Sequence, residues 1–98
     1  MNCFNCQQYF ENIFAGYLIT YDNVDSLDIF EIAVDKNFRK KGLASKLLNR
    51  INDERKILLE VSEKNKVAIN LYKKNGFKMI SRRKNYYLDG SDAIVMIR

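Results

Sequence analysis

An apolar run, then a basic turn with a glycine, then a helical repeat is the pattern that most constrains this chain. Residues 27–34 (LDIFEIAV) end in continuous apolar sequence, as a central strand does. Residues 39–44 follow the pattern R-x-x-G-x-A, and Leu43, Leu47 and Ile51 then recur on one face of a helix. The segment therefore predicts a strand, a turn and a helix of about residues 41–55, in that order.

The predicted turn has the properties of a site for a phosphate or pyrophosphate. The first N–H groups of a helix have no partner within the helix and lie at the positive end of its dipole, where anions bind. Arg39, Lys40 and Lys41 add positive charge, and Gly42 and Ala44 leave the backbone uncovered. An ordinary solvated turn with basic residues is the alternative, and the pattern alone does not decide between the two.

The remaining segments predict one small domain spanning residues 1–98, with residues 1–7 most prone to disorder. Strands are expected over residues 7–11, 13–21, 57–61, 77–83 and 92–97, and a second helix over residues 66–75. This order predicts an α+β (mixed α/β) fold. Its core is a strand–helix–strand–helix–strand unit, followed by a C-terminal antiparallel strand pair.

Composition limits the chemistry. The 98 residues include 17 Lys and Arg against 12 Asp and Glu, a net charge of +5 that favours anionic partners such as a phosphorylated cofactor, RNA or a ribosome surface. Without His, proton transfer is left to carboxylates, Tyr or Lys, and Cys3 and Cys6 alone cannot complete a zinc site. We see no signal peptide or membrane-spanning run and therefore expect a cytoplasmic protein.

A few side chains in the second half of the chain could carry chemistry. Glu60 interrupts the apolar strand ILLEV; a buried carboxylate facing a cleft could act as a base, but an outward Glu60 paired with a lysine is the alternative. Asn65 suits a helix N-cap, and Tyr72 suits the inner helix face, where core packing is the simpler role. Tyr86 and Tyr87 mark either a recognition loop or rings folded over the sheet edge.

Taken together, these motifs resemble the GNAT superfamily of acyl-CoA-dependent acyltransferases. The resemblance rests on R-x-x-G-x-A, on L-E-V with an Asn five residues after the Glu, and on A-I-N-L-Y-K-K-N-G-F. The ending R-R-K-N-Y-Y, D-G and D-A-I-V-M is similar to that of the bacterial ribosomal-protein-alanine N-acetyltransferases and related protein N-terminal acetyltransferases. The resemblance extends over nearly the whole chain.

The resemblance implies acetyl-CoA as the cofactor and assigns residues to it. The backbone of Ile32, Ala33 and Val34 would lie beside the pantetheine arm, and Asn65 would contact that arm with its side chain. The pyrophosphate would be held by the turn, which comprises Arg39, Lys40, Lys41, Gly42, Leu43, Ala44 and Ser45.

The resemblance also implies the reaction. Glu60 would act as general base on the acceptor amine, and Tyr72 would lie beside the cofactor and protonate the departing thiolate. Tyr86 and Tyr87 would form one wall of the acceptor groove. The acceptor would be the N-terminal amine of a protein or peptide, with a ribosomal protein as one candidate, and no membrane or direct nucleic-acid contact is expected.

The chain departs from the family pattern at its N-terminal end. Family members usually begin with a strand and two helices that this sequence lacks, so we expect an exposed sheet edge that pairs with a second copy or a partner chain. Two alternatives to the acetyltransferase stay open. One is a catalytically impaired acyl-CoA-binding or interaction module of the same fold, and the other is a small RNA- or ribosome-binding domain.

Overall fold

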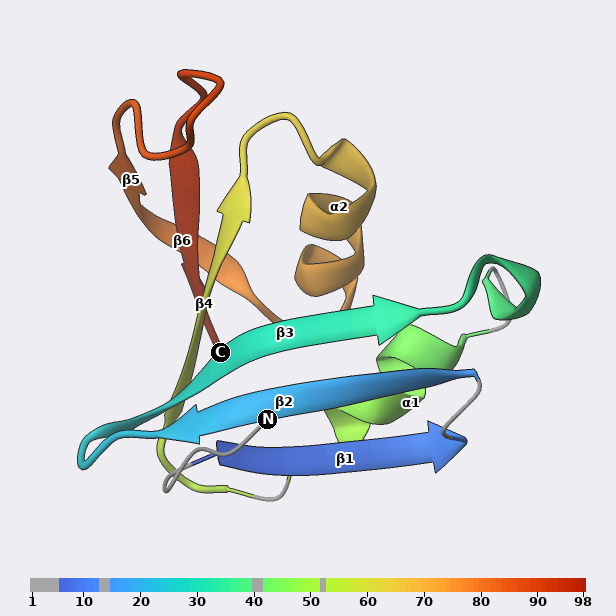
Figure 1. Cartoon of the computed structure of the whole chain (residues 1–98). Coiled ribbons are helices and arrows are strands. Elements are labelled where there is room, and N and C mark those ends of the chain that lie inside the picture. The colour runs from blue at the N-terminus through green and yellow to red at the C-terminus, as the bar shows by residue number, and fades with distance from the viewer. Residues whose placement is uncertain (1–5, 13–14, 40–41, 52) are drawn as a thin grey trace. The chain divides into compact units, whose positions relative to one another are not determined.

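The computed structural model describes residues 6–12, 15–39, 42–51 and 53–98. The chain forms two compact units, residues 1–56 and residues 57–98. Within the described residues, each unit combines antiparallel strands with one α-helix (Figure 1). No helix of this part of the chain has the length and apolar composition needed to cross a membrane.

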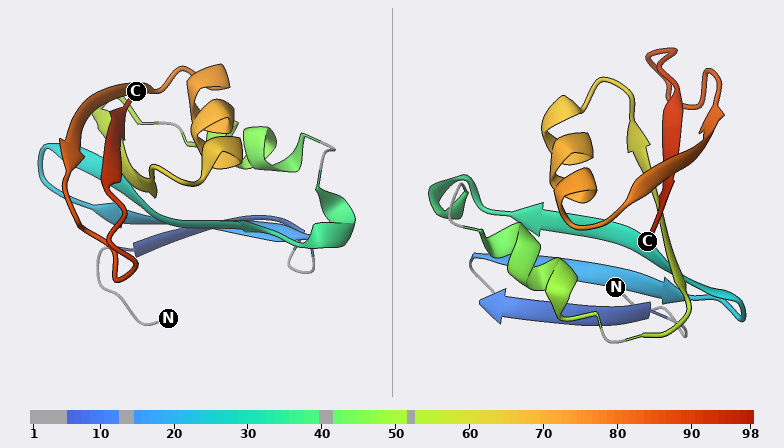
Figure 2. Two further views of the ribbon diagram at one scale, coloured as in Figure 1. Left: turned by 90° about the horizontal axis from the view of Figure 1, so that it is seen from above. Right: turned by 180° about the vertical axis from the view of Figure 1, so that it is seen from behind.

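The first unit is a three-stranded meander with a helix on one face. β1 (Cys6–Asn12), β2 (Gly16–Asp22) and β3 (Ser26–Val34) pair antiparallel in chain order. A short 3-10 turn, η1 (Lys36–Phe38), follows β3, and α1 (Leu43–Asn49) then packs against the strands (Figure 2). The prediction of a strand, a basic turn and a helix is confirmed.

The core of the first unit forms where the apolar stripe of α1 meets the strands. Leu47 and Leu48 of α1 are fully buried, as are Leu18 of β2 and Leu27 of β3. Burying a leucine side chain is worth about 2 kcal/mol, so these positions fix α1 on this face.

The helix α1 is shorter than predicted, and the expected end near residue 55 is wrong. The helix ends at Asn49 with Arg50 as C-cap. Beyond it, the carboxylate of Asp53 accepts hydrogen bonds from the backbone N–H of Arg55 at 2.8 Å and from its guanidinium at 2.7 and 3.0 Å. Arg55 also pairs with Asp22 of β2. Because these side-chain hydrogen bonds satisfy the backbone in a non-helical conformation, the helix does not continue to residue 55.

The second unit comprises β4 (Lys56–Ser62), α2 (Lys66–Lys74), β5 (Lys78–Arg83) and β6 (Ala93–Ile97). β6 lies between β4 and β5 and is antiparallel to both. The helix α2 is amphipathic and ends at the Asn75-Gly76 turn, where Gly76 has a φ of +91°. A helix commonly ends in such a left-handed glycine.

The register of the second unit places its side chains on two faces. Glu60 of β4 is opposite Val95 of β6, and Ser81 of β5 is opposite the same residue, so these three share a face. Leu59 and Met96, also opposite each other, point to the other face, which α2 covers. Glu60 therefore lies on the face of the second unit away from α2.

The predicted α+β fold is confirmed, and its strand–helix–strand–helix–strand core corresponds to β3, α1, β4, α2 and β5. The predicted C-terminal antiparallel pair is formed by β5 and β6. Details differ at the N-terminal end. β1 begins at Cys6, so the structure places Cys6 and Gln7 in a strand, and β1 continues to Asn12, one residue beyond the predicted end of this strand at residue 11.

Candidate active site

The turn that opens α1 belongs to the first unit and requires its glycine. Gly42 is the N-cap of α1 with a φ of +77°, a conformation that residues with a side chain rarely adopt. Its carbonyl accepts the N–H of Lys46 at 3.0 Å, and no side chain in the described part of the chain caps the helix. Among the described residues, and apart from its neighbours in the chain, no atom would lie within 4 Å of a Cβ built on Gly42. Lys40 and Lys41 lie outside the described residues.

Arg39 is tied to the end of β3 instead of projecting freely. Its Nε donates a hydrogen bond to the carbonyl oxygen of Val34 at 3.1 Å. Next to it, Asp35 caps η1 by accepting the N–H of Asn37 at 2.9 Å, and donates its own N–H to Ala15 at 2.7 Å. The end of β3 and the following turn are therefore fixed by local hydrogen bonds.

Gly16 is a structural requirement of this region that the sequence analysis missed. A Cβ at Gly16 would lie 2.7 Å from the backbone oxygen of Ala33 and 3.3 Å from the Cα of Val34. It would also lie 3.4 Å from the side chain of Leu43, the first residue of α1. A glycine inside a strand often marks such a close approach, and that signal was available in the sequence.

Glu60 is exposed, which decides between the two interpretations of the sequence in favour of the outward one. Its side chain is 35% exposed, and its Oε2 lies 3.3 Å from Nε of Arg83. The strand alternates between buried and exposed positions, with Ile57, Leu59 and Val61 buried. The outward, ion-paired alternative therefore describes Glu60, except that its partner is an arginine and not a lysine.

The Tyr86-Tyr87 loop is linked to Glu60 through Arg83. The guanidinium of Arg83 lies over the Tyr86 ring, 5.7 Å from its centroid, and the two tyrosine rings meet edge to face at 5.1 Å. The pKa of Tyr87 is raised, mainly by burial and further by the negative charge of Glu60. Tyr86 is 50% exposed. Glu60, Tyr86 and Tyr87 are thus brought together around Arg83.

The loop between β5 and β6 is held by carboxylates. Asp92 accepts the N–H of Asn85 at 2.9 Å, where Asn85 adopts a φ of +52°. Asp89 accepts the N–H and hydroxyl of Ser91 at 2.8 and 2.5 Å, and these bonds lower its pKa to about 2. Tyr87 donates its N–H to the carbonyl of Ser91 at 3.1 Å. The two tyrosines are therefore carried by a well-bonded turn.

Asn65 and Tyr72 are both on α2. The side-chain oxygen of Asn65 accepts the N–H of Ala68 at 3.2 Å, so the predicted N-cap is confirmed. Tyr72 is 7% exposed and packs edge to face on Phe77, with ring centroids 5.8 Å apart. Burial raises the pKa of the Tyr72 hydroxyl, which therefore keeps its proton at neutral pH.

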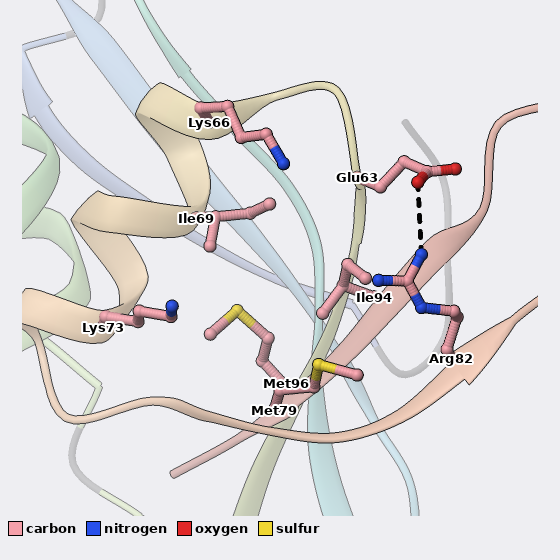
Figure 3. A pocket seen from close by; sticks show the side chains of 8 residues that line it. All are labelled: Glu63, Lys66, Ile69, Lys73, Met79, Arg82, Ile94 and Met96. Atoms are coloured by element: carbon pink, nitrogen blue, oxygen red, sulfur yellow. Dashed lines mark hydrogen bonds and ion pairs between the residues drawn. The ribbon is translucent and has the colours of Figure 1, made fainter.

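A shallow cavity of about 170 Å³ lies on the α2 face of the second unit (Figure 3). Met79, Ile94 and Met96 form its apolar floor, and Lys66 and Lys73 of α2 stand at its rim. Because Ile94 and Met96 point away from the face that carries Glu60, this cavity is separate from the Glu60–Tyr86–Tyr87 group.

The second unit therefore carries a carboxylate and a protonated phenol on opposite faces. Glu60 lies on the face away from α2, whereas Tyr72 is part of α2 itself. The register of the second unit therefore does not bring the Glu60 carboxylate and the Tyr72 hydroxyl onto one face.

A family model described as an acetyltransferase (GNAT) domain matches residues 6–79, which is more than half of the chain. The chain belongs to the GNAT acetyltransferase family. The family predicted from the motifs is thereby confirmed.

The relatives that match this chain are named N-acetyltransferases. The chain is 38% identical over 91 residues to the [ribosomal protein bS18]-alanine N-acetyltransferase of Escherichia coli K12, covering 84% of this chain and 62% of the relative. It is 42% identical over 108 residues to an N-alpha-acetyltransferase of Saccharolobus solfataricus, covering 90% and 64%. The chain thus spans less than two thirds of the length of these relatives.

Solved structures agree with the fold. The crystal structure of the ribosomal-protein-S18-alanine N-acetyltransferase from Escherichia coli matches 98% of this chain and 70% of its own, with a TM-score of 0.82 and 32% identity. Ard1 from Thermoplasma volcanium matches with a TM-score of 0.79 and 32% identity, over 86% of this chain and 62% of its own.

Proposed function

We propose that this chain is an acetyl-CoA-dependent N-acetyltransferase that acts on the N-terminal amine of a protein or peptide. The observation that carries the proposal is the grouping of Glu60 with Tyr86 and Tyr87 on one face of the second unit, in a chain of the GNAT family. The names of the relatives support a protein N-terminus as acceptor, and an N-terminal alanine of a ribosomal protein is the first candidate.

The residues that the family resemblance assigns to acetyl-CoA hold the donor in this proposal. Acetyl-CoA supplies an activated acetyl thioester. The amides at the start of α1 bind its pyrophosphate, because Gly42 adds no side chain there and no side chain of the described residues caps the helix. The backbone of Ile32, Ala33 and Val34 lines the pantetheine arm, and the amide nitrogen of Asn65 donates to the same arm while its oxygen caps α2. Arg39, Leu43, Ala44 and Ser45, with Lys40 and Lys41, complete the turn.

Proton transfer falls to Glu60 and Tyr72. Glu60 takes a proton from the acceptor ammonium, directly or through a water, which leaves a neutral amine to attack the thioester carbonyl. Tyr72 donates its hydroxyl proton to the departing sulfur, and the second proton that the attacking nitrogen loses on forming the amide returns through solvent to the Tyr72 phenolate. Tyr86 and Tyr87 orient the acceptor so that its amine meets Glu60. No enzyme nucleophile is required.

The test is binding followed by transfer. Calorimetry with acetyl-CoA measures whether the chain binds the donor, and mass spectrometry then measures acetylation of a peptide with a free N-terminal alanine. We expect binding and a gain of one acetyl group on the α-amine. The same peptide with a blocked N-terminus is the matched control and should gain nothing. No acetylation of any N-terminal peptide would contradict the proposed activity.

The second candidate is an acyl-CoA-binding or interaction module of the same fold that lacks turnover. The observation that favours it is the ion pair of Glu60 with Arg83, because a carboxylate held by a cation is less available to the acceptor amine. This candidate predicts thermal stabilisation by acetyl-CoA without transfer to any peptide.

A further inference from the structure

Two successive arginines at the end of β5 serve different faces of the second unit. Arg82 donates to Glu63 at 3.1 Å and to Asp92 at 3.0 Å, on the face that carries α2. Arg83 pairs instead with Glu60 at 3.3 Å, on the other face. The first arginine braces the β5–β6 loop through two carboxylates, so the second is not needed for that purpose.

The pair between Arg83 and Glu60 spans an entire strand. β6 lies between β4, which carries Glu60, and β5, which carries Arg83. Neighbouring strands are about 4.8 Å apart, so the backbones of β4 and β5 are separated by roughly 10 Å. Only a long cationic side chain at position 83 can reach across β6, and a substitution that shortens it removes the contact entirely.

The geometry of the pair leaves the carboxylate half free. Arg83 engages Oε2 of Glu60, and Oε1 has no hydrogen-bond partner among residues 6–12, 15–39, 42–51 and 53–98. The same guanidinium lies 5.7 Å from the centroid of the Tyr86 ring. One side chain therefore restrains both the carboxylate and the aromatic wall next to it.

Resting on the proposed function, we propose that Arg83 is a positioning residue. It holds Oε2 of Glu60 so that Oε1 faces the acceptor amine, and it keeps the carboxylate in register with the Tyr86-Tyr87 loop. Without Arg83, the Glu60 side chain, already 35% exposed, samples several rotamers and spends less time in the productive one. The loss is in the rate of the chemical step and not in the affinity for acetyl-CoA, since Arg83 is not among the residues proposed to hold the donor.

The test compares Arg83→Ala, Arg83→Gln and Arg83→Lys with Lys78→Ala as matched control. Lys78 is a cation on the same strand, exposed and without an ion pair in the described part of the chain. We expect Arg83→Ala and Arg83→Gln to lower kcat about ten- to a hundredfold, because small misplacements of a catalytic group cost that much. Arg83→Lys, which keeps length and charge, should retain most of the rate, and Lys78→Ala should equal the unmodified chain.

A double-mutant cycle with Glu60→Gln decides the mechanism, measured as single-turnover acetyl transfer. If Arg83 acts through the carboxylate, Arg83→Ala adds no further loss of rate in the Glu60→Gln background. An equal loss in both backgrounds, or an effect confined to the acceptor KM, would overturn the assignment. An unmodified chain that binds acetyl-CoA but transfers no acetyl group would overturn the proposed function, whereas an active unmodified chain whose rate Arg83→Ala leaves unchanged would overturn this inference alone.

Discussion

Replacing Tyr72 with Phe separates the proposed proton donor from the packing of its ring. Tyr72 is 7% exposed and packs on Phe77, and phenylalanine keeps that ring contact. No hydrogen bond of the Tyr72 hydroxyl is found within the described residues, so its loss should change the free energy of unfolding by about 1 kcal/mol or less. Tyr72→Ala, in contrast, removes the ring and should cost about 3–5 kcal/mol.

The effect of Tyr72→Phe on the reaction should be much larger than its effect on stability. General acid catalysis contributes about 10²–10⁴-fold, so kcat should fall by that factor, equivalent to about 3–5 kcal/mol in the barrier. Release of the free thiol of coenzyme A gives the rate, and chemical denaturation gives the stability. Because burial raises the pKa of Tyr72, no alkaline loss of rate from its ionisation is expected below about pH 10. A Tyr72→Phe rate within twofold of the unmodified chain at every pH would refute the role of acid.

Three further predictions concern the turn, the cap and the loop. Gly16→Ala places a Cβ 2.7 Å from the Ala33 oxygen and should cost about 1–3 kcal/mol in denaturation, with weaker acetyl-CoA binding by calorimetry. Asn65→Ala should cost about 1 kcal/mol and weaken acetyl-CoA binding, whereas Asn65→Ser, which keeps the cap to Ala68, should restore stability but not affinity. Asp89→Asn should lower Tm at pH 7, because the folded pKa of Asp89, about 2, is below its unfolded value; this difference should vanish as the pH falls from about 4 to 2. Unchanged acetyl-CoA affinity in Gly16→Ala would contradict the first prediction. Asn65→Ser binding acetyl-CoA as tightly as the unmodified chain would contradict the second. A Tm difference between Asp89→Asn and the unmodified chain that persists at pH 2 would contradict the third.

The order of strands and helices could be predicted from the sequence because the buried positions repeat at the spacing of each element. The same signal misplaced the end of α1. Ile51 continues the apolar spacing of Leu47 and is indeed buried, yet it follows the end of the helix. Apolar spacing reports burial, whereas the end of α1 is set by polar bonds between Asp53, Arg55 and β2 that the periodicity does not contain.

The candidate site was only partly predictable for a related reason. Local features such as the Gly42 turn and the Asn65 cap follow from neighbouring residues, and both are found. The surroundings of Glu60 depend on which face of the second unit α2 covers and on Arg83, which is 23 positions further along the chain. Such non-local pairing cannot be read from the local pattern ILLEV, so the sequence left open whether the carboxylate of Glu60 faces a cleft or lies outward.

Glu60→Gln tests the central claim most directly, because it changes one atom of the proposed base and leaves the predicted donor turn untouched. The measurement pairs the dissociation constant for acetyl-CoA by calorimetry with the rate of acetylation of an N-terminal alanine peptide by mass spectrometry. We expect the dissociation constant to stay within about twofold and the rate to fall about 10²–10⁴-fold. A Glu60→Gln chain that acetylates the peptide as fast as the unmodified chain, or that loses donor binding and transfer to the same extent, would contradict the assignment of Glu60 as the base.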